Sequence, residues 1–122
     1  MKRTIRCLGM ALVAFGVLVP AVPAANWTEG MKESKPEFKS MGPLAFGPEG
    51  ILFVADTKAA AIIAVATGDT APAKDAKALK VEGINQKIAA LLGTAADQIL
   101  INDMVVNPIS HSAYLAIARG RG

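Results

Sequence analysis

The chain has a single cysteine, Cys7, and a single histidine, His111, among its 122 residues. One thiol cannot form a disulfide within the chain, so a disulfide-stapled domain is excluded. One histidine also excludes a zinc site built from several histidines of one chain. Ser110 and Ser112 flank His111, but this spacing is typical of turn residues rather than of a nucleophile paired with its base. No catalytic set and no cofactor are therefore expected.

An excess of positive charge is also missing once the first 24 residues are set aside. The full chain has 13 Lys and Arg residues and 10 Asp and Glu residues, which gives a net charge of +3. Three of the basic residues are Lys2, Arg3 and Arg6, so the rest of the chain has ten basic and ten acidic side chains. A balanced chain has no basic patch to neutralise phosphates, which excludes a strongly basic nucleic-acid binder. About half of the remaining residues are hydrophobic, too many for a disordered chain.

The three basic residues at the start precede an uncharged apolar run, residues 8–19, which is followed by Pro20 and Pro23. A positive segment, an apolar run and small residues at its end are the three parts of a secretory signal. The run is shorter than the about 20 residues that span a bilayer. We therefore predict cleavage between Ala24 and Ala25, export to the periplasm or the outside of a bacterial cell, and no stable membrane span afterwards. The alternative is a retained anchor.

The rest of the chain divides into a polar arm and a β-rich region. Residues 25–40 are charged and aperiodic, and we expect them to form an extended arm. Residues 41–122 contain short, apolar, branched runs separated by Pro, Gly and Asp, which is typical of strands linked by tight turns. Strands are expected near residues 43–47, 51–56, 61–66, 98–101, 103–107 and 113–119.

One short helix is expected inside a polar insertion at about residues 69–93. Four apolar residues recur at helical spacing and fall on one helix face: Ile84, Ile88, Leu91 and Leu92. Gly93 follows directly and is suited to end the helix. A helix of this length is marginal by itself, so its apolar face must pack on something.

Two stretches of the chain resemble each other. Residues 44–48 (LAFGP) and residues 104–108 (MVVNP) each form a short apolar run that ends in a proline and is followed by a turn and a second apolar run. A propeller blade of four strands takes about 40–45 residues, and the insertion accounts for the longer repeat here. We therefore predict a mainly β fold: an antiparallel four-stranded propeller-type blade, with residues 98–101 as its fourth strand, and part of a second blade.

Residues 42–57 resemble the repeat of NHL-type β-propellers and of the related senescence-marker/gluconolactonase-like propellers. In those families the pattern P-x-G-x-Φ-Φ-V-A-D-T, with Φ apolar, marks the turn and second strand of a blade, and residues 48–57 read PEGILFVADT. The likeness covers residues 42–69 well and residues 103–119 loosely. It implies a propeller architecture. It leaves the function open, because these families bind proteins, sugars and RNA and include several hydrolases.

The chain departs from those families in two ways. Gluconolactonase-like enzymes carry a metal-binding Glu before a Gly-Pro pair, whereas Met41 stands before Gly42 and Pro43 here. A thioether is a poor ligand for a hard divalent cation, so we expect no tight metal site. Propellers also have typically four to eight blades. We therefore expect either an N-terminal fragment of a longer protein or a sheet that other chains close.

The residue types that bind metals are few and scattered. Asp56 ends a predicted strand, and we expect its carboxylate to cap backbone N–H groups of the turn rather than to line a channel or bind a cation. Asp103 and Asn107 are four residues apart and share one strand face, with His111 in the turn that follows. These four are the weak metal candidates, and strand-end and turn roles are favoured for them.

The sequence thus predicts an exported propeller-type binding or scaffold module, whose ligand or protein partner is unknown and whose open strand edges favour self-association. The first alternative is the N-terminal part of an exported hydrolase or lyase, with active-site residues in later blades. The second is a small α+β domain in which the repeat is a coincidence.

Overall fold

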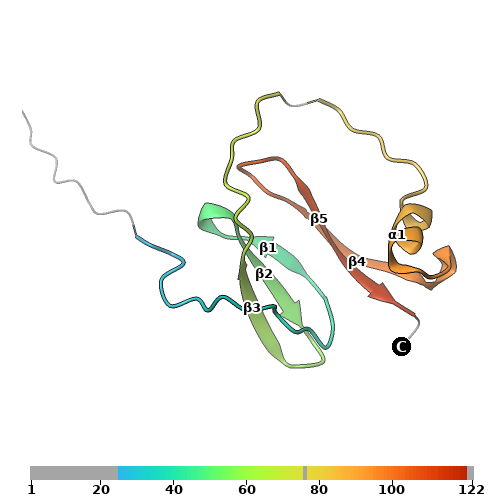
Figure 1. The fold of residues 1–122 in the computed structure, drawn as a ribbon, viewed down its shortest axis with the longest axis horizontal. Coiled ribbons are helices and arrows are strands. Elements are labelled where there is room, and N and C mark those ends of the chain that lie inside the picture. Colours follow the sequence, from blue (N-terminus) through green and yellow to red (C-terminus); the bar gives the residue numbers. More distant parts are fainter. Residues whose placement is uncertain (1–24, 76, 121–122) are drawn as a thin grey trace, which may run out of the picture.

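The computed structural model describes residues 25–75 and 77–120, so the predicted signal segment lies outside the described residues. The described part is mainly β, with two antiparallel sheets and one helix (Figure 1). Its elements are β1 (Leu44–Phe46), β2 (Ile51–Asp56), β3 (Ala61–Ala66), α1 (Ile84–Leu92), β4 (Ile99–Val106) and β5 (Ala113–Arg119), with short 3-10 turns at Pro48–Gly50 and Ala96–Gln98. Residues 25–43 before β1 contain neither a helix nor a strand.

The first sheet has the order β1-β2-β3, and its central strand β2 carries most of the core. Ile51, Leu52 and Val54 of β2 are buried, as suits a β-branched, apolar strand between two neighbours. The turn before β2 depends on Gly50, which has a φ of +71°. A Cβ atom at this residue would lie 3.0 Å from the carbonyl oxygen of Asp69, so both the backbone conformation and the available space require glycine.

The second sheet corrects the predicted four-stranded blade. Residues 98–101 do not form the fourth strand of the first sheet, because β4 is one strand that pairs with β5 from Ile99–Arg119 to Val106–Ala113. A register irregularity lies between Ile101 and Asp103, near the predicted break between two strands. The turn between β4 and β5 is short, whereas pairing β4 with β3 requires closure of the long segment between them. The first sheet therefore has three strands, and β3 is an edge strand.

The two sheets meet where β1 lies beside β4 (Figure 1). The backbone N–H of Leu44 donates a hydrogen bond of 2.7 Å to Oδ2 of Asp103. The side-chain amide of Asn102 donates to the carbonyl oxygen of Met41 at 2.6 Å. The rings of Phe46 and Tyr114 also pack edge to face, with centroids 5.1 Å apart. Side chains, rather than a shared ladder, therefore join the sheets.

Helix α1 forms at the predicted residues and packs on the start of β4. Gly93 ends it in the left-handed conformation, with its N–H donating to the carbonyl oxygen of Ala89. Ala89 is the buried residue of the helix, whereas Leu91 is 86% exposed. The predicted apolar face is therefore only partly covered. No helix in the described residues is long and apolar enough for a membrane span.

The first prediction concerns the small core around β2. Ile51 is 3% exposed, and Ile62 on β3 is 75% exposed. We expect Ile51→Ala to lower the free energy of unfolding by about 2–5 kcal/mol, because it removes buried methyl groups and leaves a cavity. The matched control Ile62→Ala should change it by at most about 0.5 kcal/mol. Urea denaturation of both variants measures the difference, and equal losses would contradict the described core.

Candidate functional site

Asp56 ends β2 and is 1% exposed. Its carboxylate accepts hydrogen bonds from the backbone N–H groups of Lys39 at 2.6 Å and of Ser40 and Ala59 at 3.0 Å each. The Ser40 hydroxyl donates a fourth, at 2.8 Å. This is the turn-capping role expected from the sequence. It also ties the N-terminal arm to the turn between β2 and β3.

These contacts set the protonation of Asp56. Burial raises the pKa of this carboxyl, but the hydrogen bonds from Ser40, Lys39 and Ala59 outweigh burial and hold the pKa below its ordinary value of 3.8. Asp56 is therefore an anion in the neutral range, with its oxygens occupied by the protein's own donors. A cation at Asp56 would have to compete with these donors.

Asp69, which follows β3, organises a second cluster with residues of the β4–β5 turn. Its Oδ2 atom accepts hydrogen bonds from the hydroxyls of Ser110 at 2.5 Å and Tyr114 at 3.0 Å, and from the amide of Asn107 at 3.1 Å. The Asn107 amide also donates to the backbone carbonyl of Asp69 at 2.7 Å. We call Asp69, Asn107, Ser110 and Tyr114 the Asp69 cluster. It connects the end of the first sheet to the second.

The pKa values within the Asp69 cluster follow from these contacts. The hydrogen bond from Ser110 is the main cause that holds the pKa of Asp69 below 3.8, and Tyr114 and Asn107 add to it against the effect of burial. Burial raises the pKa of Tyr114 above 10.0, and its hydrogen bond to Asp69 raises it further. Tyr114 therefore stays a protonated donor and Asp69 stays an acceptor. The donors of the cluster are thus paired with the Asp69 carboxylate, and the cluster forms a structural hydrogen-bond network.

Asn107 was a candidate from the sequence alone, and its partner Asp69 was not. Asn107 is completely buried, and its Oδ1 atom also accepts the backbone N–H of Ile109 at 2.9 Å. A signal was present in the repeat, because Asn107 stands before Pro108 where Gly47 stands before Pro48. A side-chain amide at the position where the other repeat has a glycine indicates that this amide has a hydrogen-bond partner. The partner is distant in the chain, so the pattern did not identify it.

Asp103 and His111, the other weak metal candidates, have separate surroundings. Asp103 accepts the N–H groups of Leu44 and Met104, and the bond from Leu44 is the main cause that lowers its pKa below 3.8. His111 is exposed in the β4–β5 turn, with a φ of +60°. In residues 25–75 and 77–120 no three His, Cys, Asp or Glu side chains gather as a metal site requires. The carboxylates of Asp56 and Asp103 instead accept hydrogen bonds from backbone N–H groups.

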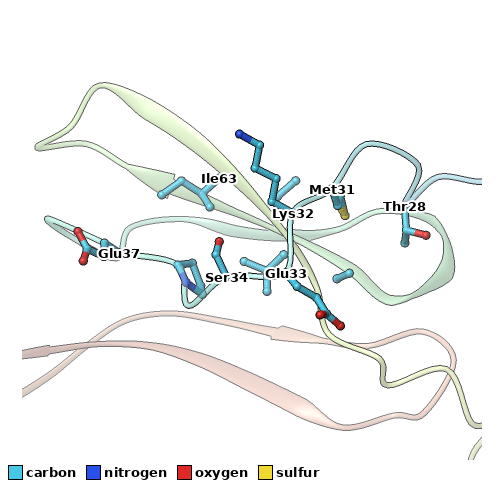
Figure 2. A pocket seen from close by; sticks show the side chains of 11 residues that line it. Thr28, Met31, Lys32, Glu33, Ser34, Glu37 and Ile63 are labelled. Carbon is cyan, nitrogen blue, oxygen red and sulfur yellow. The ribbon is translucent and has the colours of Figure 1, made fainter.

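Two larger clefts border the first sheet. One, of about 720 Å³, lies between β3 and the N-terminal arm, and Figure 2 shows Lys32, Glu33 and Glu37 of the arm and Ile63 of β3 among the residues that line it. The other, of about 780 Å³, lies between the two sheets, at the end where Met41 precedes β1 and Arg119 ends β5. Met41 lies in the wall of this second cleft.

Comparisons with known proteins give no match. No protein-family model matches the chain. No curated protein and no solved structure matches it either. The likeness to propeller repeats therefore depends on the residues and the local geometry of this chain alone.

The second prediction concerns acid stability. Asp56, Asp69 and Asp103 have folded-state pKa values below 3.8. Their contribution to stability is therefore complete well above pH 3.8 and is lost as the pH falls through the lower folded-state values. Tyr114 has a raised pKa, so its contribution is lost as the pH rises through a value above 10.0. Thermal unfolding should show a plateau near neutral pH, with a fall of the melting temperature on both sides.

A pair of variants tests whether Asp69 causes the fall of the melting temperature at low pH. Asp69→Asn removes the ionisable acceptor, so we expect a lower melting temperature at pH 7 and a shallower fall below pH 4. Asp97→Asn changes an exposed residue at the turn before β4 and is the control. It should keep the wild-type profile. Identical profiles for wild type and Asp69→Asn would show that Asp69 does not hold the sheets together.

Proposed function

We propose that the protein is an exported binding or scaffold module of the β-propeller type. The observation that carries the proposal is that, in both repeats, the backbone N–H of the residue before the proline closes the turn that follows, across four residues in the first repeat and five in the second. The N–H of Gly47 donates to the carbonyl oxygen of Ile51 at 2.8 Å, and the N–H of Asn107 donates to that of Ser112 at 2.9 Å. Ile51 begins β2 and Ser112 directly precedes β5, so each bond closes a hairpin between the two apolar runs of its repeat.

The arrangement of the sheets supports the same proposal. β1 and β4 are the first strands of the two repeats, and they lie beside each other through the contacts of Leu44 with Asp103 and of Asn102 with Met41. Neighbouring blades of a propeller place equivalent strands around a common centre, so adjacent first strands suit that architecture. The propeller architecture itself belongs to this proposal.

Binding is favoured over catalysis because the candidate catalytic groups already have structural partners. Asp56, Asp69 and Asp103 accept hydrogen bonds from donors of the chain itself. His111 lies exposed in a turn. Nucleophilic catalysis requires a nucleophile and a base within hydrogen-bond reach of each other, with a third group to orient the base. The described residues contain no such set, and their surfaces suit recognition better.

The edge of β3 is the part of the proposed module that favours association. β3 has the sequence AIIAVA, which contains neither charge nor proline. Native edge strands are commonly protected by charged residues, prolines or bulges, because their free backbone groups pair with other strands. Residues 61–66 have none of these, and Ile62 is exposed. We propose a protein partner or a second copy at this edge.

The third prediction concerns export. The basic and apolar residues before Ala25 are those of a secretory signal. The protein recovered from outside the cytoplasm should therefore lack residues 1–24 and begin at Ala25. Intact-mass measurement, followed by N-terminal sequencing, checks both the loss and the cleavage point. A full-length protein found only in the cytosol would refute the export proposal.

The fourth prediction tests the open edge. We expect the protein to self-associate, and Ile62→Lys to shift the mass toward the monomer, because a charge on an edge strand opposes pairing. Leu91→Lys is the control, since Leu91 is just as exposed but lies on α1. Size-exclusion chromatography with light scattering measures each mass. A wild type that is monomeric and unfolds in one cooperative transition would contradict the proposal that the β3 edge is open. Equal effects of the two variants on the mass would contradict the role of β3 in self-association.

A further inference from the structure

The cleft between the two sheets collects positive charge. It is lined by residues that precede β1, by the β2–β3 turn and by the ends of β4 and β5 that lie together. Lys39, Lys58 and Arg119 are the charged residues of its wall, and each comes from a different one of these segments. A net charge of zero outside residues 1–24 makes this local concentration of one sign notable. Clefts lined by one sign of charge concentrate the field and attract ions of the opposite sign.

The three cations are not neutralised by described acidic side chains. Among the residues that the structure describes, the ion pair is Lys80 with Glu82, in the segment before α1. Asp56 contacts Lys39 only through its backbone N–H, and the Asp56 side chain is almost completely buried. Lys39, Lys58 and Arg119 are exposed to solvent. Their charges are therefore available to a ligand in the cleft.

The rest of the cleft is partly apolar. Phe38, Met41, Leu100 and Ile117 contribute hydrophobic side chains to its wall, and Asn102 contributes an amide. Leu100 is exposed although it belongs to a strand. Ligand sites typically combine apolar walls with a few polar groups that fix the orientation of the ligand. This cleft combines these features with three cations.

We propose that this cleft binds an organic anion: a carboxylate or phosphate monoester that carries a short apolar chain. Arg119 and the two lysines hold the charged head, and the apolar wall receives the chain. The proposal names a ligand class for the binding module proposed above and rests on that function. The groove beside β3 does not offer the same chemistry, because its wall carries Lys32 together with Glu33 and Glu37.

Calorimetric titration of the full chain with four probes tests the proposal. The probes are octanoate, octyl phosphate, octanol and inorganic phosphate. We expect one of the two chain-bearing anions to bind at least about tenfold more tightly than octanol, because octanol lacks the charge. It should also exceed inorganic phosphate, since each buried methylene group adds up to about fourfold in affinity. The tighter of the two anions identifies the head group.

A double variant assigns the binding to the cleft. Lys58→Gln with Arg119→Gln should weaken binding of the preferred anion by about tenfold or more. Lys77→Gln with Lys87→Gln removes the same charge from the connecting segment and α1, and it should leave the affinity unchanged. Circular dichroism of both double variants checks that they are folded. Raising the salt concentration should weaken octanoate binding and leave octanol binding unaffected.

The outcomes separate this inference from the proposed function. Binding of octanol as tightly as the tighter of the two chain-bearing anions, equal losses in the two double variants, or no binding of any probe would overturn the anion site. None of these results changes the masses in the edge-strand experiment, so the module proposal stands or falls separately. Binding of inorganic phosphate as tightly as octyl phosphate would overturn the role of the apolar wall.

Discussion

The carboxylate of Asp69 is the interaction on which the arrangement of the two sheets depends. Each sheet is small, and the fully buried apolar side chains come mainly from β2. The buried apolar area is therefore too small to fix the orientation of one sheet against the other by itself. Asp69 supplies a directional link, because Ser110, Tyr114 and Asn107 all donate to it from the second sheet. A carboxylate with several donors fixes distance and angle together, which apolar contact does not.

The same use of carboxylates recurs at Asp56 and Asp103, and it bears on function. Asp56 fastens the arm to the β2–β3 turn, and Asp103 fastens β4 to the backbone of Leu44. These acids maintain the geometry of the molecule and leave its surface for recognition. Lys39, Lys58 and Arg119, which form no ion pair with described acidic residues, lie in the cleft between the sheets. This arrangement is the basis of the proposal of a binding module.

The local sequence pattern predicted those elements that are stabilised mainly by residues close to them in the chain. The strands at 51–56 and 61–66 follow from branched apolar runs between turn residues, and α1 follows from the spacing of Ile84 and Ile88 with Gly93 as its end. The role of Asp56 was predictable for the same reason, since a carboxylate at a strand end lies near the N–H groups of the next turn. The partner of Asn107 was not, because Asp69 lies 38 residues away in the chain.

The sequence by itself determined the order of strands and helix, the turns of the three hairpins and the balance of charge outside residues 1–24. These depend on residues within a few positions of one another. Only the tertiary structure decided that residues 98–101 pair with β5 rather than with β3, and that Lys39, Lys58 and Arg119 share one cleft. Strand partners and converging side chains depend on which distant segments meet. That choice is made by loop closure and by side-chain contacts such as those of Asp69 and Asp103, which no local pattern contains.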